Sequence, residues 1–392
     1  MSLSTRKAPG MHVLKGHSTK PNGREAVAEA TEGWSVQTTL DLILVFNSSE
    51  QDPHEVAAAF RERFGDTPFV GCTTAGEHLG DAHFTKALVC IGISSPGIRW
   101  AIAAAETLER FDEENARALS DQLFGQLGIQ REEVNPQRQF CLLLVDGLSG
   151  KEEVLCPLMA DALEGMPLVG GSAGDDLKFQ RTYLYHGGMA HPSGAVFVLA
   201  DSKMPFEVIK HQHYTTTTKR LVITKADVPA RRVYEMDGVP AIQAYADAIG
   251  RPISAINDDV TLSNPLTFVC NDEIYVRSIA RIEPDGSMVF FCAIEEGMVL
   301  SLGEHEDMTT ALRRDVDGLA QRIKGADLLI GCNCILRALE ATKLDKHPSL
   351  SKIFSDFAGN MIGFDTYGEQ LNGLHINQTF VGVAIRGAEA AR

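Results

Sequence analysis

Val-Gly-Cys-Thr-Thr-Ala-Gly-Glu, at residues 70–77, is the stretch from which the fold of this sequence is best inferred. Similar stretches follow at residues 169–176 (VGGSAGDD) and 362–369 (IGFDTYGE). An apolar run and then a helical stretch precede each of them. The spacing from the start of the apolar run to the glycine is 29 residues (42 to 71), 28 (142 to 170) and 35 (328 to 363). The three stretches therefore belong to one repeated unit.

Each unit closes with a further apolar strand, at residues 87–93, 195–199 and 380–385. Alternating strand and helix signals of this kind are typical of an α/β fold. We therefore predict an α/β protein built on three related strand–helix–strand–Gly-turn–strand units.

The length of 392 residues exceeds what one ordinary hydrophobic core contains, so we predict two sheet-and-helix domains. Their predicted limits are residues 31–220 and 221–385. Residues 1–30 contain few apolar anchors, and we predict that they form a polar arm.

The charge and the hydropathy pattern exclude several classes of protein. A formal net charge of −16 argues against nucleic-acid binding, which needs concentrated Lys and Arg. No run approaches the roughly 18 apolar residues of a membrane span, and the N-terminus lacks the apolar segment of a secretion signal. Most of the eight cysteines lie in apolar strand-like runs, as free buried thiols do in a reducing compartment. We therefore expect a cytoplasmic protein without membrane insertion.

The repeated units also indicate where a ligand would bind. A strand that ends in small polar residues and opens a helix forms the usual ligand-facing edge of an α/β sheet, because the helix N-terminus offers unpaired N–H groups. The candidate ligand contacts at these edges are Cys72, Thr73, Ser172, Cys332 and Arg337, the last of which could reach a carboxylate.

Each of these candidates has a structural alternative. Glycine-rich strand joints are more often structural corners than binding loops. Cys332 and Cys334 would share one face of a strand and pack there, which is the favoured interpretation. Arg337 could equally be a solvated helix residue. The turns lack the Lys of a phosphate-binding loop and the spacing of a dinucleotide fingerprint, so no nucleotide site is predicted.

An acidic residue recurs at the equivalent turn of each unit, as Glu77, Asp175 and Glu369. No Ser-His-Asp order, His-Glu-x-x-His or Gly-x-Ser-x-Gly motif accompanies these acids. One acid per repeat fits a structural role, in which the carboxylate accepts backbone N–H groups at each corner. We therefore predict no catalytic site and a protein that is not an enzyme.

Several separated motifs resemble those of a known family. VGCTTAGE and VGGSAGDD, followed by YLYHGGMAHPSGAVFVL, resemble the FIST N-terminal domain. The segments that resemble the FIST C-terminal domain are 222–226, 233–241, 264–265, 276–278, 294–297, IGFDTYGEQ at 362–370 and 377–379. The resemblance implies a sensory domain of signal-transduction proteins that binds small ligands such as amino acids. Stand-alone members similar to this chain bind haem and sense nitric oxide, and they regulate a histidine kinase or a cyclic-di-GMP enzyme (diguanylate cyclase or phosphodiesterase).

The resemblance also points to a place for haem b, since haem-sensing members carry a His–aromatic pair that His213-Tyr214 matches. His211 and His213 stand two residues apart, so on one strand both would face the same cavity. We predict that His213 is the axial iron ligand, with His211 and Tyr214 beside it. Alternatively, these are exposed residues of a polar linker. The chain would then be a haem-free module for a small polar metabolite such as an amino acid, acting through a separate signalling partner.

Overall fold

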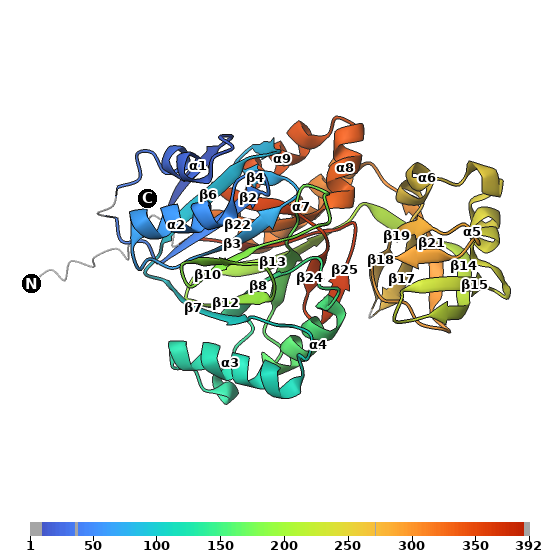
Figure 1. Cartoon of the computed structure of the whole chain (residues 1–392), viewed down its shortest axis with the longest axis horizontal. Coiled ribbons are helices and arrows are strands. Elements are labelled where there is room, and N and C mark those ends of the chain that lie inside the picture. Colours follow the sequence, from blue (N-terminus) through green and yellow to red (C-terminus); the bar gives the residue numbers. More distant parts are fainter. Residues whose placement is uncertain (1–9, 36–37, 271, 388–392) are drawn as a thin grey trace, which may run out of the picture. The chain divides into compact units, whose positions relative to one another are not determined.

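The computed structural model describes residues 10–35, 38–270 and 272–387, and these fall into two compact units (Figure 1). The core unit takes the described residues of 1–210, 313–374 and 380–392. The inserted unit takes those of 211–312 and 375–379. Among the described residues, no helix combines the length and the apolar character needed to cross a membrane.

The core unit contains the three predicted repeats. The first runs β1 (His12–Ser18), α1 (Gly23–Ala30), β2 (Leu42–Ser48), α2 (Pro53–Phe64), β3 (Phe69–Thr74), β4 (Glu77–Leu79), β5 (Ala82–Phe84) and β6 (Leu88–Ser94). The second runs β7 (Ile98–Ala105), α3 (Glu113–Leu127), the 3-10 turn η1 (Arg131–Glu133), β8 (Gln139–Val145), α4 (Glu152–Ala162), β9 (Leu168–Ser172), β10 (Leu184–His186), β11 (Met189–His191) and β12 (Ala195–Ser202).

The third repeat is interrupted after its first strand by the inserted unit. It runs β13 (Phe206–His211), then α7 (Met308–Ile323), β22 (Leu328–Cys334), α8 (Ile335–Lys343), α9 (His347–Phe357), β23 (Met361–Thr366), β24 (Glu369–Leu371), β25 (Leu374–Ile376) and β26 (Phe380–Ile385). Two helices separate β22 from β23, where one helix separates the equivalent strands of the other repeats. The second helix explains the longer spacing in the third copy of the sequence unit.

The three repeats build three sheets with the same strand order. Among the described residues each sheet has six strands, in the orders β1-β6-β2-β3-β10-β11, β25-β24-β9-β8-β12-β7 and β13-β26-β22-β23-β4-β5. The hairpin at one end of each sheet comes from a different repeat: β4–β5 pairs with β23, β10–β11 with β3, and β24–β25 with β9. The repeats are therefore interlocked in a cycle, and the predicted α/β architecture of three related units is confirmed.

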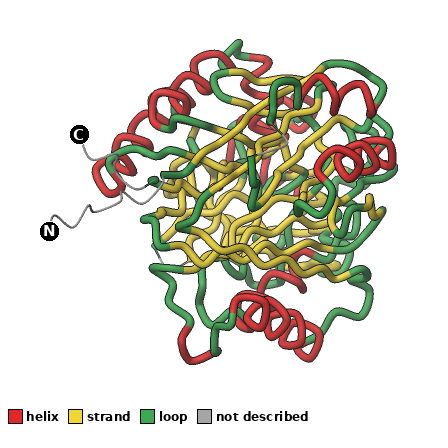
Figure 2. The backbone as a smooth tube through the Cα atoms, turned by 90° about the vertical axis from the view of Figure 1, so that its left-hand side faces the viewer, coloured by secondary structure: helices red, strands yellow, loops and turns green. Residues whose placement is uncertain are grey.

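The parallel strands at the centre of each sheet are buried along their whole length, as near-continuous apolar runs predict. Figure 2, in which the core unit faces the viewer, shows the strands of this unit in its middle and helices around them. A small apolar cavity of about 20 Å³ is lined by side chains of all three sheets, including Phe46, Leu143 and Phe364. The hydrophobic cores of the repeats thus meet at one junction.

The recurring glycines of the sequence motif have a packing role. Gly71, Gly170 and Gly363 each lie opposite a residue of the neighbouring parallel strand. A Cβ atom at these positions would lie 1.6, 2.1 and 2.5 Å from the carbonyl oxygen of that facing residue. Only glycine permits such close approach of two backbones. The structural interpretation of these glycines is therefore correct, although they lie within strands and not at corners.

The described part of the predicted polar arm, residues 10–30, forms a strand and a helix. β1 pairs with β6 along its whole length, from His12 with Ser94 to Ser18 with Leu88. Helix α1 is capped by the Asn22 side chain and buries a short apolar stripe, formed by Ala26, Val27 and Ala30. Helix α1 is only eight residues long and its buried side chains are small, so the sequence pattern alone did not indicate it. Residues 1–9 of the predicted arm lie outside the described residues.

The inserted unit is a sheet with its own hydrophobic core. Its elements are β14 (Tyr214–Asp227), β15 (Arg232–Met236), β16 (Val239–Pro240), α5 (Ala241–Ile249), η2 (Ile253–Ala255), α6 (Asp258–Ser263), β17 (Leu266–Cys270), β18 (Glu273–Arg277), β19 (Ile279–Ile282), β20 (Met288–Phe290) and β21 (Val299–His305). Seven strands follow the order β18-β17-β21-β14-β15-β20-β19, and β16 pairs with β15. Ile223, Tyr245, Leu266 and Phe290 are among the buried residues of its core.

Each compact unit is made of segments that are not consecutive in the chain. They divide the sequence near residues 210 and 312, because β22, β23 and β26 belong to the same interlocked body as the first two repeats. The limits of 31–220 and 221–385 remain predictions about the two sequence domains.

Candidate functional site

The carboxyl ends of the three parallel strand pairs form three equivalent polar edges. The register places Asn47 beside Thr73 at the end of β2/β3, which we call edge 1. It places Val145 beside Ser172 at the end of β8/β9 (edge 2) and Asn333 beside Asp365 at the end of β22/β23 (edge 3). Ligands of open α/β sheets bind at such carboxyl edges.

A cleft of about 580 Å³ adjoins edge 1, and we call it the edge cleft. This volume is within the range of pockets for small molecules. Its rim carries exposed side chains of both charges, and Thr73 forms part of its wall. The residues that line it are Ser49, Glu50, Asp52, Pro53, Thr73, Asp175, Lys178, Gln180, Arg181 and Tyr183.

The loop of residues 174–182 forms one wall of the edge cleft and is held by a buried carboxylate. Asp175 accepts the backbone N–H groups of Phe179 (2.9 Å), Gln180 (2.6 Å) and Arg181 (2.9 Å). The hydroxyl of Tyr367 donates to the same carboxylate at 2.5 Å. The structural role predicted for this recurring acid is therefore confirmed for Asp175.

The same loop stores backbone strain. Asp176, Leu177 and Phe179 adopt positive φ angles of 55°, 62° and 51°, which non-glycine residues rarely adopt. Strain of this kind costs on the order of 1 kcal/mol or more per residue and clusters at ligand-binding sites. The loop conformation is therefore imposed by its hydrogen bonds.

The loop is also tied directly to edge 1. One carboxylate oxygen of Asp176 accepts hydrogen bonds from the Ser48 hydroxyl (2.9 Å), the Ser49 N–H (2.8 Å) and the Ser49 hydroxyl (2.6 Å). Lys178 Nζ donates to the Ser49 hydroxyl at 2.8 Å. These hydrogen bonds fix the loop of residues 174–182 relative to the carboxyl end of β2.

The start of helix α2 beside this cleft does not offer the unpaired N–H groups expected from the sequence. Asp52 precedes the helix, and its carboxylate accepts the N–H groups of His54 (2.8 Å) and Glu55 (3.1 Å). Pro53, at the first helical position, has no N–H group. A ligand in the edge cleft must therefore be held by side chains, of which Lys178 and Arg181 carry positive charge.

The two predicted cysteines are placed as packing residues. Cys72 and Cys332 are both buried on central strands, and burial raises the pKa of each thiol above its ordinary value. A Cβ atom on Gly171 would lie 3.0 Å from the sulfur of Cys332, so the thiol fills space against the neighbouring sheet. Neither thiol lines the edge cleft.

Ser172, the candidate at edge 2, is buried and engaged on both sides. Its hydroxyl donates to Glu152 Oε1 at 3.0 Å and accepts from Gln370 Nε2 at 2.9 Å. Edge 2 is thus closed by hydrogen bonds between side chains, and Ser172 lies apart from Thr73 and the edge cleft.

Edge 3 contains Arg337 and a group of side chains that the sequence interpretation missed. Arg337 is 1% exposed, so it is not a solvated helix residue, and its Nε donates to Asn333 Oδ1 at 3.2 Å. Asp365 contacts His78 Nε2 at 2.8 Å and His83 Nε2 at 2.7 Å. Burial tends to raise the pKa of Asp365, but the two imidazoles hold it well below its usual range.

An alignment of the three repeats could have pointed to Asp365, because this residue occupies the position of Thr73 and Ser172. The histidines could not be found in that way. They lie on the β4–β5 hairpin of the first repeat, and only the exchanged pairing with β23 brings them to edge 3.

Two family models match this sequence. The model of the FIST N domain matches residues 41–239, and the model of the FIST C domain matches residues 241–372. The chain belongs to the FIST family. FIST domains are sensor domains of signal transduction. The uncharacterized protein MJ1623 of Methanocaldococcus jannaschii is 24% identical to this FIST chain over 351 residues, which cover 80% of this chain and 67% of that protein.

The residues predicted to hold haem in this FIST chain do not share one strand. β13 ends at His211 and β14 begins at Tyr214, so Gln212 and His213 form the connection between them. Both histidines are fully buried, which rules out the alternative of an exposed linker. The His213 ring lies 4.4 Å from that of Tyr214 and 5.0 Å from that of His305.

The rings of Tyr214 and His305 thus flank His213 within the inserted unit. Iron must bind an imidazole nitrogen directly, so an axial histidine needs open space in front of its ring. His213 has no exposed surface, even to a water-sized probe. Haem at His213 would therefore require the neighbouring side chains to move, and it stays a prediction.

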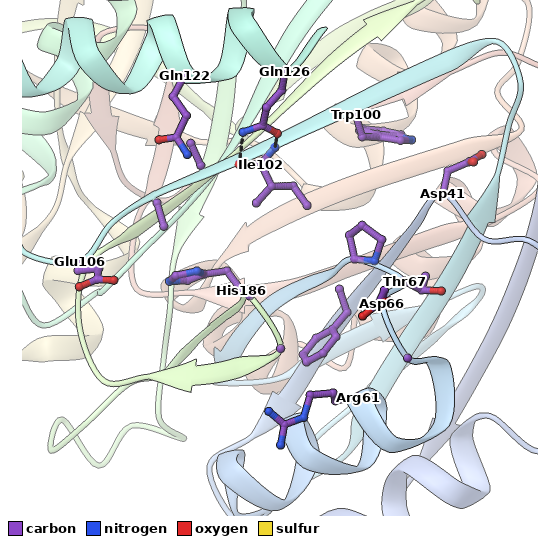
Figure 3. Close-up of a pocket in the computed structure, with 17 residues that line it drawn as sticks. Asp41, Arg61, Asp66, Thr67, Trp100, Ile102, Glu106, Gln122, Gln126 and His186 are labelled. Atoms are coloured by element: carbon purple, nitrogen blue, oxygen red, sulfur yellow. Dashed lines mark hydrogen bonds between the residues drawn. The ribbon is translucent and has the colours of Figure 1, made fainter.

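A second cleft, of about 640 Å³, lies at the amino ends of β2 and β3 in the core unit (Figure 3). Figure 3 shows Gln122, Gln126 and Trp100 on one side of it and Arg61 on the other. The Gln126 side-chain amide accepts the N–H of Ile102 (3.1 Å) and donates to its carbonyl oxygen (2.9 Å). This amide is therefore already bonded to the backbone of β7. Ligands favour the carboxyl ends of such strands, so we take the edge cleft as the candidate functional site. The cleft at the amino ends serves for comparison in the experiments below.

Proposed function

We propose that this FIST chain is a sensor that binds a small zwitterionic metabolite, such as an amino acid, in the edge cleft. The observation that carries the proposal is a cleft of about 580 Å³ at a carboxyl edge, with both charges on its rim. Its strained wall is held by Asp175 and Asp176, so the site is formed before the ligand arrives.

The charges of the rim suggest how such a ligand would be oriented. Arg181 and Lys178 would face its carboxylate, because guanidinium and ammonium groups are the strong donors for that group. Glu50, which also lines the cleft and pairs with Lys86 at 2.7 Å, would face its ammonium group. The Thr73 side chain is buried and its hydroxyl accepts the Tyr183 N–H at 2.9 Å, so Thr73 supports the wall of the cleft.

In this proposal the chain performs no chemical reaction and passes its signal to a separate protein. A histidine kinase or an enzyme of cyclic-di-GMP turnover is the partner that the family resemblance implies. Kinase or cyclase activity measured with and without this chain, in the presence of its ligand, tests that part. An activity that the ligand-loaded chain leaves unchanged would contradict it for the enzyme tested.

Thermal unfolding in the presence of each common amino acid tests the ligand class. A ligand at about 100 times its dissociation constant adds about 2.7 kcal/mol to the free energy of unfolding, so the melting temperature should rise for one or a few of them. Arg181→Gln should abolish the rise without changing the melting temperature of the free chain, because Arg181 is exposed.

The matched control is Arg61→Gln, which removes an exposed arginine from the other cleft. This variant should respond to the ligand as the wild type does. A rise that survives Arg181→Gln but is lost in Arg61→Gln would move the site to the cleft of Figure 3 and refute the proposal.

Haem-based sensing of nitric oxide at His213 is the second candidate. It is supported by the family resemblance and by the grouping of His213, Tyr214 and His305, and it requires these rings to move apart. Protein from haem-supplemented cells should then show a Soret band that His213→Ala shifts and His12→Ala leaves alone. A chain without such a band, or a band that His213→Ala does not alter, would refute haem ligation by His213.

A further inference from the structure

Edge 3 brings two imidazole nitrogens and a carboxylate together at one point of the core unit. The ligand atoms of His78, His83 and Asp365 all lie within 4.8 Å of one another. His78 Nε2 faces one carboxylate oxygen and His83 Nε2 faces the other. Imidazole nitrogen and carboxylate oxygen are ligands of Zn²⁺ and of other first-row divalent metals.

The backbone of two repeats fixes this geometry. His78 on β4 and His83 on β5 are direct partners across their hairpin, with ring centroids 4.7 Å apart. The hairpin belongs to the first repeat and pairs with β23 of the third, which carries Asp365. Gly76 leaves the space for the carboxylate, since a Cβ atom there would lie 2.3 Å from Asp365 Oδ2. The three ligands are thus held by regular strands.

Surrounding side chains orient the three groups, as second partners do around metal ligands. Asn333 Nδ2 donates to Asp365 Oδ1 at 2.7 Å, and Arg337 in turn donates to Asn333. The His347 ring stacks on His83 with centroids 3.8 Å apart and planes 9° apart. His347 Nε2 lies 3.1 Å from the Ala338 carbonyl oxygen, so this ring supports His83 from the side.

The equivalent positions of the other two edges show what is particular to edge 3. At edge 1 the Tyr185 hydroxyl, from an exchanged hairpin, donates to Asn47 Oδ1 at 2.7 Å. At edge 2 Gln370 bonds Ser172 in the same way. A neutral hydrogen bond is therefore enough to attach a hairpin to its edge. Among the three edges described, edge 3 alone replaces it with two histidines and a carboxylate.

We propose that His78, His83 and Asp365 form a binding site for one divalent transition-metal ion, with Zn²⁺ as the probe. Three protein ligands leave a coordination position for water or another small ligand. The histidine side chains are 10% and 11% exposed, so an ion can reach them from solvent. The ion would fasten the hairpin of the first repeat to the strand of the third.

Equilibrium dialysis of the full chain against Zn²⁺, followed by metal analysis, tests the proposal. The wild type should retain one equivalent, and its melting temperature should rise with the metal because only the folded chain assembles the site. His83→Ala and Asp365→Asn should lose the bound equivalent. Asn333→Ser, which removes an orienting bond, should weaken binding by roughly 10- to 100-fold.

The control is His12→Ala, since His12 is an exposed histidine of β1 outside the cluster. This variant should retain the metal. Circular dichroism identifies any variant that fails to fold, and His83→Gln then replaces His83→Ala, because it preserves side-chain volume without an imidazole nitrogen. A wild type that retains no Zn²⁺, or folded His83 and Asp365 variants that retain it fully, would overturn the proposal in favour of a metal-free His–Asp–His network.

Discussion

Single residues decide whether each equivalent edge is open or closed. Ser172 at edge 2 is enclosed between Glu152 and Gln370, whereas Thr73 at edge 1 borders a cleft. Asp365 at edge 3 faces two histidines. The same position of the repeat therefore has a different polar environment at each edge. The difference comes from the side chains that neighbouring loops and hairpins bring to it.

At the residue scale, Asp201 should make stability depend on pH. Burial tends to raise its pKa, but hydrogen bonds from Arg138, Arg99 and Gln139 lower it to about 2. A carboxylate whose pKa falls on folding stabilises the protein above the pKa of the unfolded chain, and this contribution is lost as the pH falls toward 2. Asp201→Asn should therefore reduce the free energy of unfolding by about 1–2 kcal/mol at pH 7.

Urea unfolding at pH 7 and at pH 3 measures this effect. The difference between Asp201→Asn and the wild type should shrink at the lower pH, where the wild-type carboxylate begins to lose its advantage. A difference of equal size at both values would show that the arginine contacts do not stabilise the charged form.

At the scale of elements, the central strand pairs depend on glycine. Gly71 faces Val45, and a Cβ atom would lie 1.6 Å from the carbonyl oxygen of that residue. Gly71→Ala should force β2 and β3 apart and lower the free energy of unfolding by about 3 kcal/mol or more. Gly125, inside helix α3, has no atom within 4 Å of its would-be Cβ atom. Gly125→Ala should therefore stabilise the chain by up to about 1 kcal/mol.

Thermal or denaturant unfolding of the two variants compares them directly. The expected changes have opposite signs, although the substitution is the same. A Gly71→Ala variant as stable as the wild type would show that the strands tolerate a wider separation and that the recurring glycine has another purpose.

Elements whose signal is local were predictable, and contacts between repeats were not. The strand, helix and glycine turn of each repeat recur in the sequence. The register places Thr73 near the carboxyl end of β3, and its contact with a ligand stays a prediction. Lys178 and Arg181 were missed because they lie in an irregular loop, which has no periodic pattern. His78 and His83 were missed for a different reason. They serve a strand almost 300 residues later, and single-sequence patterns contain no information on such pairing.

At the scale of the whole molecule, the exchanged hairpins should make the core unit unfold as one body. Each repeat supplies the end hairpin of another repeat's sheet, in a closed cycle. Loss of one repeat would therefore expose strand edges in the others. A destabilising substitution such as Gly170→Ala in the second repeat should lower hydrogen-exchange protection in the central strands of all three sheets.

Hydrogen exchange followed by mass spectrometry resolves β2, β8 and β22 separately. Protection should fall by the same free energy in all three strands. A loss confined to β8 and β9 would show that the repeats unfold independently and that the hairpin exchange does not couple them.

A crystal structure of the chain with the amino acid found by thermal screening tests most directly whether the ligand of this FIST chain lies in the edge cleft. We predict ligand density beside Thr73, with the ligand carboxylate against the Arg181 guanidinium and the loop of residues 174–182 in its present conformation. Density in the cleft beside Arg61 and Trp100, with the edge cleft empty, would contradict the account.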